Sequence, residues 1–226
     1  MIKAIVLDFD GTIVDSNEIK REAYFRLFSP SKNAQKIIGT IDRINGTRWE
    51  IIRKILVALK AAGEVDFSDL EKEVKNRGLE YGKMVKEEII AGEGIPGAFE
   101  SLWQLKREGF RIHLNSVTPE GPLKEIIDVL IKNGDLPELQ GVFGRKEGIK
   151  EEITAKILNF EQILSLEGLK PDEVVFVGDR EIDRKTAEII GCHFIGVENE
   201  ISEWTKTDFP RVTDLKDLPR MIEEIR

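Results

Sequence analysis

Four short apolar runs, separated by longer stretches with helical spacing, constrain the fold of this 226-residue chain more than any other feature. The runs lie at residues 4–7, 110–116, 173–179 and 193–197, and residues 141–144 form a fifth, very short one. Helical patterns occupy residues 97–108, 122–132 and 150–166, each with a glycine shortly after its end. Strands that alternate with helices predict a Rossmann-like α/β fold, in which a parallel sheet has helices on both faces.

Residues 16–91 break this alternation, because their apolar residues follow helical spacing without a convincing strand pattern. One such series, with members three, four or seven residues apart, consists of Phe67, Leu70, Val74, Tyr81, Val85 and Ile89. We therefore expect an all-helical domain at residues 16–91, inserted into a core formed by residues 1–15 and 92–226. The glycine-rich stretch at residues 91–97 is typical of a linker that returns the chain to the core.

The ends of the predicted strands are where chemistry is expected, since parallel sheets bind ligands outside the carboxyl ends of their strands. Asp8 and Asp10 follow the first run, and Asp179 ends the run at 173–179. Carboxylates brought close together repel each other, and a divalent cation removes that cost. Mg²⁺ favours such hard oxygen ligands. The sequence therefore predicts a magnesium site, with Asp183 one helical turn after Asp179 to hold the ligands in place.

Two segments together resemble a known family. Asp8-Phe9-Asp10-Gly11-Thr12-Ile13-Val14-Asp15-Ser16 resembles the first motif of phosphatases of the haloacid dehalogenase (HAD) superfamily, and Val177-Gly178-Asp179-Arg180-Glu181-Ile182-Asp183 resembles their fourth. The similarity extends to Pro96-Gly97-Ala98 and to Phe194-Ile195-Gly196-Val197, so it covers the whole predicted core. Residues 16–91 fall where this family has a helical cap domain.

The resemblance implies a mechanism with an aspartyl-phosphate intermediate. Asp8 would attack phosphorus as the nucleophile. Asp10 would protonate the leaving oxygen and later activate water, which explains why two carboxylates occur together. The metal ligands implied by the family are the carboxylates of Asp8 and Asp179 and the backbone carbonyl of Asp10.

Two further motifs of the family bind the phosphoryl group. The second motif is a small hydroxyl residue at the end of the next strand, a position that Ser116 occupies. The third is a lysine that offsets charge on the transferring phosphoryl group. The common Lys-Pro-x-Pro form is absent here. Lys150 is favoured because Lys-x-x-Ile at the start of a helix resembles the variant form, and Lys146 is the alternative.

The predicted cap is more positively charged than the remainder of the chain. Residues 16–91 contain 15 Lys and Arg against 12 Asp and Glu, whereas the whole chain has a net charge of −8. This excess would attract an anionic substrate, although solvation of the surface explains it equally well. Gly46-Thr47-Arg48 resembles the cap segment of beta-phosphoglucomutases, in which an arginine contacts the non-transferring phosphate. The resemblance implies that Arg48 binds a second anionic group of the substrate, phosphate or carboxylate.

These residues predict a magnesium-dependent phosphatase that acts on a small phosphorylated metabolite. A phosphomutase of the beta-phosphoglucomutase type is an alternative, because its core motifs are nearly the same. A catalytically idle binding or regulatory protein could share the fold. The complete set of Asp8, Asp10, Ser116, Lys150 and Asp179 disfavours that reading, and Asp10 also disfavours a dehalogenase, since that branch lacks this carboxylate.

Composition narrows the expected partners and location. The net charge of −8 disfavours a nucleic-acid binder, which needs a basic surface. No apolar run reaches the ~18 residues of a membrane helix, and the N-terminal run is shorter than the ~7–15 residues of a secretion signal. Cys192 is the only cysteine, which makes a reducing compartment the simplest expectation. We therefore expect a cytoplasmic enzyme without nucleic-acid or membrane partners.

Overall fold

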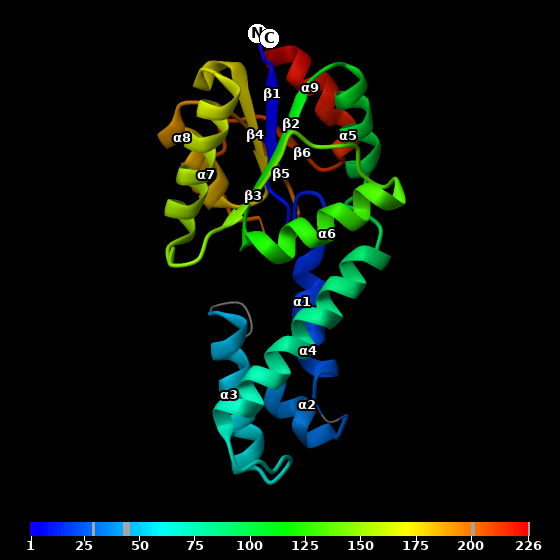
Figure 1. Cartoon of the computed structure of the whole chain (residues 1–226), viewed down its shortest axis with the longest axis vertical. Coiled ribbons are helices and arrows are strands. Elements are labelled where there is room, and N and C mark those ends of the chain that lie inside the picture. Colours follow the sequence, from blue (N-terminus) through cyan, green and yellow to red (C-terminus); the bar gives the residue numbers. More distant parts are fainter. Residues whose placement is uncertain (29, 43–45, 200–201, 226) are drawn as a thin grey trace. The chain divides into compact units, whose positions relative to one another are not determined.

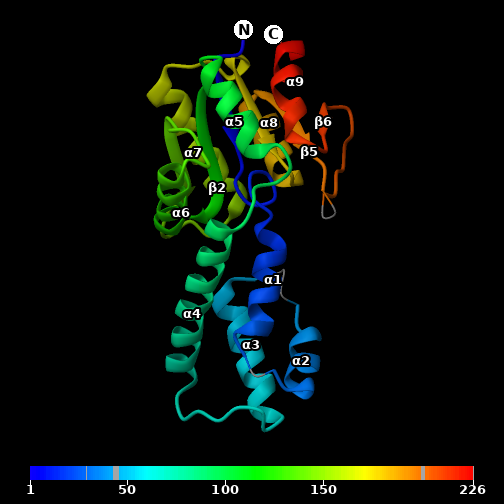
Figure 2. The same cartoon turned by 90° about the vertical axis from the view of Figure 1, so that its right-hand side faces the viewer.

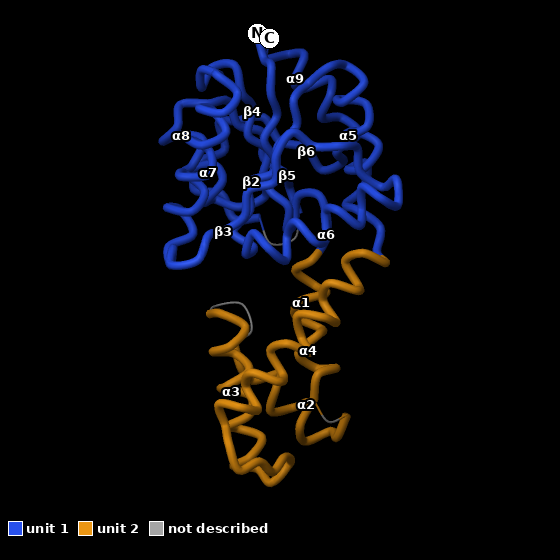
Figure 3. Tube along the Cα trace, viewed as in Figure 1, with its two compact units in different colours: residues 1–15, 92–226 blue, residues 16–91 orange. Residues whose placement is uncertain are grey.

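A computed structural model describes residues 1–28, 30–42, 46–199 and 202–225. The chain forms two compact units (Figure 3): unit 1 comprises Met1–Asp15 and Gly92–Arg226, and unit 2 comprises Ser16–Ala91. No helix within the described ranges has the length and apolar character needed to cross a membrane.

Unit 1 is built on a six-stranded parallel sheet with the order β3-β2-β1-β4-β5-β6. The strands are β1 (Ala4–Leu7), β2 (Arg111–Pro119), β3 (Gly141–Arg145), β4 (Val174–Gly178), β5 (His193–Val197) and β6 (Arg211–Val212). Every residue of β1 and β4 is buried, as expected for central strands with helices on both faces. The predicted fold is confirmed, and the edge strand β6 is added to it.

Helices cover both faces of this sheet (Figures 1 and 2). On one face α7 (Glu152–Glu167) packs against α8 (Glu181–Ile190). The other face carries α5 (Ala98–Arg107), α6 (Glu120–Asn133) and α9 (Leu218–Ile225). Phe176 of β4 packs edge-to-face against Phe160 of α7 and Phe194 of β5, which anchors α7 to the sheet.

The regular elements in the described residues of unit 2 are all helices. Its helices are α1 (Ser16–Arg26), α2 (Lys32–Gly39), α3 (Arg48–Ala61) and α4 (Leu70–Ala91). The periodic residues Val74, Tyr81, Val85 and Ile89 form the buried face of α4, as their spacing predicts. Tyr81 stacks on Tyr24 of α1 with 4.5 Å between ring centroids. This packing gives the inserted helices a core of their own.

The register of the central strands brings distant parts of the chain to one edge of the sheet. Leu7 of β1 lies opposite Leu114 of β2 and Val177 of β4. The residues that follow these three are therefore neighbours. Position 178 must be glycine, because a Cβ there would lie 2.5 Å from Cγ of Asp183. Gly178 thus lets the first turn of α8 lie close against the end of β4.

Candidate active site

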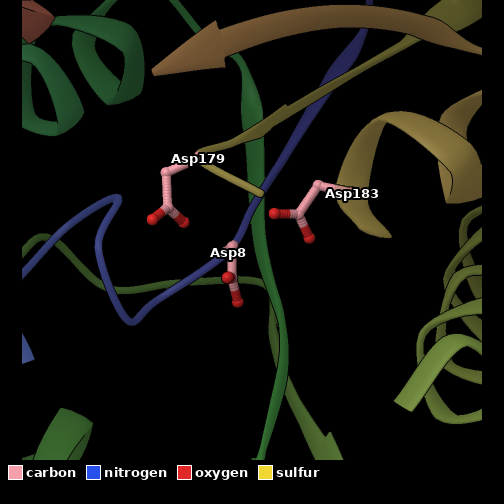
Figure 4. Close-up of side chains that lie close together, drawn as sticks. All are labelled: Asp8, Asp179 and Asp183. Carbon is pink, nitrogen blue, oxygen red and sulfur yellow. The ribbon is translucent and has the colours of Figure 1, made fainter. Parts of the chain in front are cut away.

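Three aspartate side chains converge at the carboxyl ends of β1 and β4 (Figure 4). Asp8 follows β1, Asp179 follows β4, and Asp183 lies in the first turn of α8. One carboxylate oxygen from each residue lies within 4.8 Å of the others, and all three side chains are buried. The predicted acidic cluster thus forms in three dimensions from two segments about 170 residues apart.

Burial makes this cluster of negative charge costly. Burial, opposed by Lys156 and reinforced by Asp183, Asp179 and Asp10, raises the pKa of Asp8 to about 8. The pKa of Asp179 rises to about 6, first through burial and then through Asp183. Oδ1 of Asp8 and Oδ1 of Asp183 are both buried, and within the described part of the chain the Lys156 ammonium is the only donor that lies close to them. Such an excess of hard anionic oxygen fits a divalent cation such as Mg²⁺.

Lys156 of α7 places a positive charge inside the cluster. Its Nζ lies 3.0 Å from Oδ1 of Asp8 and 2.6 Å from Oδ1 of Asp183, and it donates to the backbone carbonyl of Asn115 at 3.1 Å. Burial alone would lower the pKa of Lys156, but Asp183 and Asp8 together raise it above its ordinary value. The ammonium is therefore charged and is held by three acceptors.

The lysine beside Asp8 is thus Lys156, whereas the sequence motif favoured Lys150. Lys150 is exposed and precedes α7, and Lys146 is exposed and donates to Gln162 at 2.6 Å. The helix begins at Glu152, so the lysine that reaches Asp8 lies one turn inside it. A signal existed in the sequence, because Lys156 falls on the buried face of α7 together with Phe160 and Ile163.

The second carboxylate of the first motif is held by β2. Thr118 donates its hydroxyl hydrogen to Oδ2 of Asp10 at 2.5 Å. Ser116, the predicted phosphate-binding hydroxyl, is buried in β2, and its Oγ accepts the N–H of Thr118 at 3.1 Å. Gly11 turns the chain after Asp10 with a φ of 79°, a conformation that other residues rarely adopt. The role of Thr118 was not predicted from the sequence.

Asp179 and Asp183 are held by hydrogen bonds from neighbouring loop residues. Oδ1 of Asp179 accepts the hydroxyl of Thr12 at 3.3 Å, and Oδ2 accepts Nδ2 of Asn199 at 3.0 Å. Asn199 also donates to the carbonyl of Gly11 at 3.1 Å, which ties the loop after β5 to the loop after β1. Oδ2 of Asp183 accepts the N–H of Arg180 at 3.0 Å and so caps α8.

Arg48, the predicted substrate-binding arginine, belongs to unit 2 and is the first residue of α3. Its guanidinium carbon lies 4.6 Å from the centroid of the Trp49 ring. The guanidinium also lies against the backbone of α4, because a Cβ at Gly82 would be 2.7 Å from its Nη1. Partial burial lowers the pKa of Arg48, opposed by Tyr81 and Tyr24. No carboxylate in the described ranges forms an ion pair with it.

The core is a parallel sheet with acidic side chains at the ends of β1 and β4, a buried lysine beside them and an inserted set of helices. This combination is typical of hydrolases of the haloacid dehalogenase type. The family model for haloacid dehalogenase-like hydrolases matches residues 2–191. The chain belongs to this family, which confirms the predicted family and the prediction of an enzyme.

Individual proteins of this family are similar over most of the chain. A phosphoglycolate phosphatase of Cereibacter sphaeroides is 26% identical over 199 residues, which cover 84% of this chain and 82% of that one. The enolase-phosphatase E1 of Aquifex aeolicus is 23% identical over 235 residues, covering 96% and 99%. A solved Thermotoga maritima structure, assigned as a beta-phosphoglucomutase, superposes with a TM-score of 0.73 at 17% identity and covers 100% of both chains. At this identity the structural likeness shows the shared fold.

Proposed function

We propose that this protein is a magnesium-dependent phosphatase that hydrolyses a small phosphorylated metabolite through an aspartyl-phosphate at Asp8. The observation that carries the proposal is the buried carboxylate of Asp8 with the Lys156 ammonium 3.0 Å away and two further aspartates within 4.8 Å. A phosphoryl group is anionic, so a carboxylate can attack it only where positive charge offsets the repulsion. Lys156 provides part of that charge from the chain itself.

The proposed metal ligands are the carboxylates of Asp8 and Asp179 and, as the family resemblance implies, the backbone carbonyl of Asp10. Asp183 already accepts the N–H of Arg180 and pairs with Lys156, which favours a role in holding the ligands rather than in direct ligation. The chemistry that Mg²⁺ supplies when bound is neutralisation of charge on the phosphoryl oxygens and on Asp8.

In the proposed reaction the two carboxylates of the first motif act in turn. Asp8 forms a bond to phosphorus while the bond from phosphorus to the leaving oxygen breaks, and Asp10 gives a proton to that oxygen. Asp10 then takes a proton from the water that attacks the aspartyl-phosphate, which releases inorganic phosphate and restores Asp8. Ser116 would bind phosphoryl oxygens during both steps, and Thr118 keeps Asp10 beside them.

For the substrate we propose a small phosphomonoester with a second anionic group, such as phosphoglycolate. Arg48 supports this choice, because its guanidinium forms no ion pair with a carboxylate in the described ranges. A carboxylate of the substrate would provide the bidentate partner that suits a guanidinium. The similarity to phosphoglycolate phosphatases over 84% of this chain points to the same class of substrate.

The test is a screen of the purified protein with Mg²⁺ against phosphoglycolate, sugar phosphates and an aryl phosphate. Free phosphate and isomerised sugar phosphate are both measured. We expect phosphate release that stops in chelator and in Asp8→Asn, while Asp208→Asn, at an exposed aspartate, keeps full activity. Isomerisation without phosphate release would instead show a phosphomutase. Full activity of Asp8→Asn would refute the mechanism.

A further inference from the structure

Two buried asparagines lie behind the active site and have no role in the chemistry above. Asn115 of β2 and Asn159 of α7 are both completely or almost completely buried. Nδ2 of Asn159 donates to Oδ1 of Asn115 at 3.1 Å and to the carbonyl of Gly144 in β3 at 3.2 Å. Asn159 therefore ties α7 to two strands at once.

Burial of these two amides costs free energy, which their hydrogen bonds must offset. A buried amide loses its bonds to water and must recover them within the protein. Apart from Lys156, the other buried residues on this face of α7, which are Ala155, Phe160 and Ile163, have apolar side chains. An apolar contact between a helix and a sheet tolerates small slides, whereas a directional hydrogen bond favours a single register. The two amides therefore fix the position of α7 on the sheet more narrowly than apolar packing alone would.

The position defined in this way is that of Lys156. Asn115 and Lys156 exchange hydrogen bonds: Nδ2 of Asn115 donates to the carbonyl of Lys156 at 2.9 Å, and Nζ of Lys156 donates to the carbonyl of Asn115 at 3.1 Å. A slide of α7 by one residue would move Lys156 by ~1.5 Å along the helix axis. Such a movement would disrupt the contacts of 3.0 Å to Asp8 and 2.6 Å to Asp183.

We propose that Asn115 and Asn159 are positioning residues for Lys156. Their hydrogen-bonded pair holds α7 in one register against β2 and β3, and this register places the Lys156 ammonium between Asp8 and Asp183. The consequence for turnover rests on the proposed function of Asp8. The consequence for the ammonium itself does not, and it can be measured without a substrate.

The first test compares Asn159→Ala with Ile163→Ala, which removes apolar packing one turn further along the same buried face. Both variants should have a lower Tm. In Asn159→Ala we expect kcat to fall by ~10- to 10²-fold with KM nearly unchanged, as for other small misplacements of reacting groups. Ile163→Ala should keep kcat. In a Lys156→Met background, Asn159→Ala should cause no further loss of kcat, because the residue that it positions is gone.

The second test is an NMR measurement of the Lys156 ammonium in ¹⁵N-labelled protein. A buried ammonium with three acceptors exchanges its hydrogens slowly and should give a ¹⁵Nζ signal, which its loss in Lys156→Met assigns. We expect Asn159→Ala to shift or broaden this signal and Ile163→Ala to leave it unchanged. Should Asn159→Ala fail to fold, Asn159→Ser retains a donor for Asn115 and should show a smaller change in the same direction.

The possible outcomes separate the two proposals. Absence of turnover by the wild-type protein with every substrate would refute the proposed function, and the ammonium signal would still decide the role of Asn159. An unchanged signal and unchanged kcat in a folded Asn159 variant would overturn the positioning role. Equal losses of kcat in Asn159→Ala and Ile163→Ala, or a further loss in the Lys156→Met background, would overturn it as well.

Discussion

Thr118 of β2 contacts both hydroxyl and carboxylate groups of the proposed active site: its Oγ1 donates to Oδ2 of Asp10 at 2.5 Å, and its N–H donates to Oγ of Ser116 at 3.1 Å. We predict that Thr118→Val, which keeps the shape and removes the hydroxyl donor, lowers kcat by about tenfold, an effect of the size expected for one hydrogen bond to a charged group. Thr118→Ser restores the donor and should restore kcat. Equal kcat values for the valine and serine variants would show that this hydrogen bond is unimportant.

Asp10 itself should matter far more than the residue that holds it. In Asp10→Asn we expect kcat to fall by ~10²–10⁴-fold, the usual contribution of general acid–base catalysis. Metal binding should change little, because the family resemblance assigns only the backbone carbonyl of Asp10 to the ion. Steady-state kinetics and calorimetric titration with Mg²⁺ measure the two effects separately. A kcat within about tenfold of the wild-type value would show that Asp10 is not the acid–base group.

Lys156 and Lys150 provide a direct test of the third motif. Lys156→Met should lower kcat by ~10²–10³-fold, because it removes a charge that stabilises the transferring phosphoryl group. It should also destabilise the metal-free protein by about 3–5 kcal/mol, since Asp8 and Asp183 lose their buried partner. Lys150→Met is the matched control at an exposed position, and its kcat and Tm should stay near wild type. The reverse pattern would restore Lys150 as the motif lysine.

The raised pKa values in the acidic cluster predict how stability depends on pH without metal. The pKa of Asp8 is about 8 in the folded protein, mainly through burial, against 3.8 for the free side chain. The folded state therefore binds more protons than the unfolded state between these values, and stability falls as pH rises through this range. His113 has the opposite effect at the lower end, because burial lowers its pKa to about 4 from 6.5. Its contribution to stability grows with pH up to about 6.5 and is constant above that.

The interval from about pH 6.5 to about pH 8 therefore isolates the titration of Asp8, because it lies above the pKa of about 6 for Asp179 and above the range in which His113 contributes. We expect the Tm of the metal-free protein to decrease across this interval and the stabilisation by Mg²⁺ to increase, because protons compete with the ion for Asp8. Thermal scans in chelator and in Mg²⁺ measure both trends. Asp8→Asn, which removes the titrating group, should weaken both trends. An identical pH profile for Asp8→Asn and the wild type would contradict the raised pKa of Asp8.

Arg48 should affect recognition of the substrate rather than the chemistry. We expect Arg48→Ala to raise KM for phosphoglycolate, or for the substrate that the screen identifies, by about tenfold or more, the value of a hydrogen bond between charged groups. Hydrolysis of an aryl phosphate, which lacks the second anionic group, should be nearly unchanged. Arg53→Ala is the control on the same helix, because Arg53 is partly exposed and already pairs with Glu71. Equal losses on both substrates would indicate a role in packing or chemistry, and no loss on either would show that Arg48 does not bind the substrate.

The sequence by itself determined the layers of the core and the place of the acidic residues. Both depend on local patterns: apolar runs such as residues 4–7 predict buried strands, and Asp8, Asp10 and Asp179 occur directly at strand ends. The carboxyl ends of parallel strands share one edge of the sheet, so these residues could be expected to meet. The helical character of residues 16–91 follows equally from local spacing.

Only the tertiary structure decided which further side chains reach those acids. Whether Lys156 or Lys150 reaches Asp8 depends on where α7 begins and on which of its faces lies against the sheet. A local motif does not specify the start of a helix to within a few residues. Thr118 and Asn199 reach the cluster through strand register and a returning loop. The two-residue strand β6 pairs with β5 at the edge of the sheet, a contact that local spacing did not predict. These contacts join residues far apart in sequence, so their energies come from packing and pairing across the sheet, which no single segment encodes.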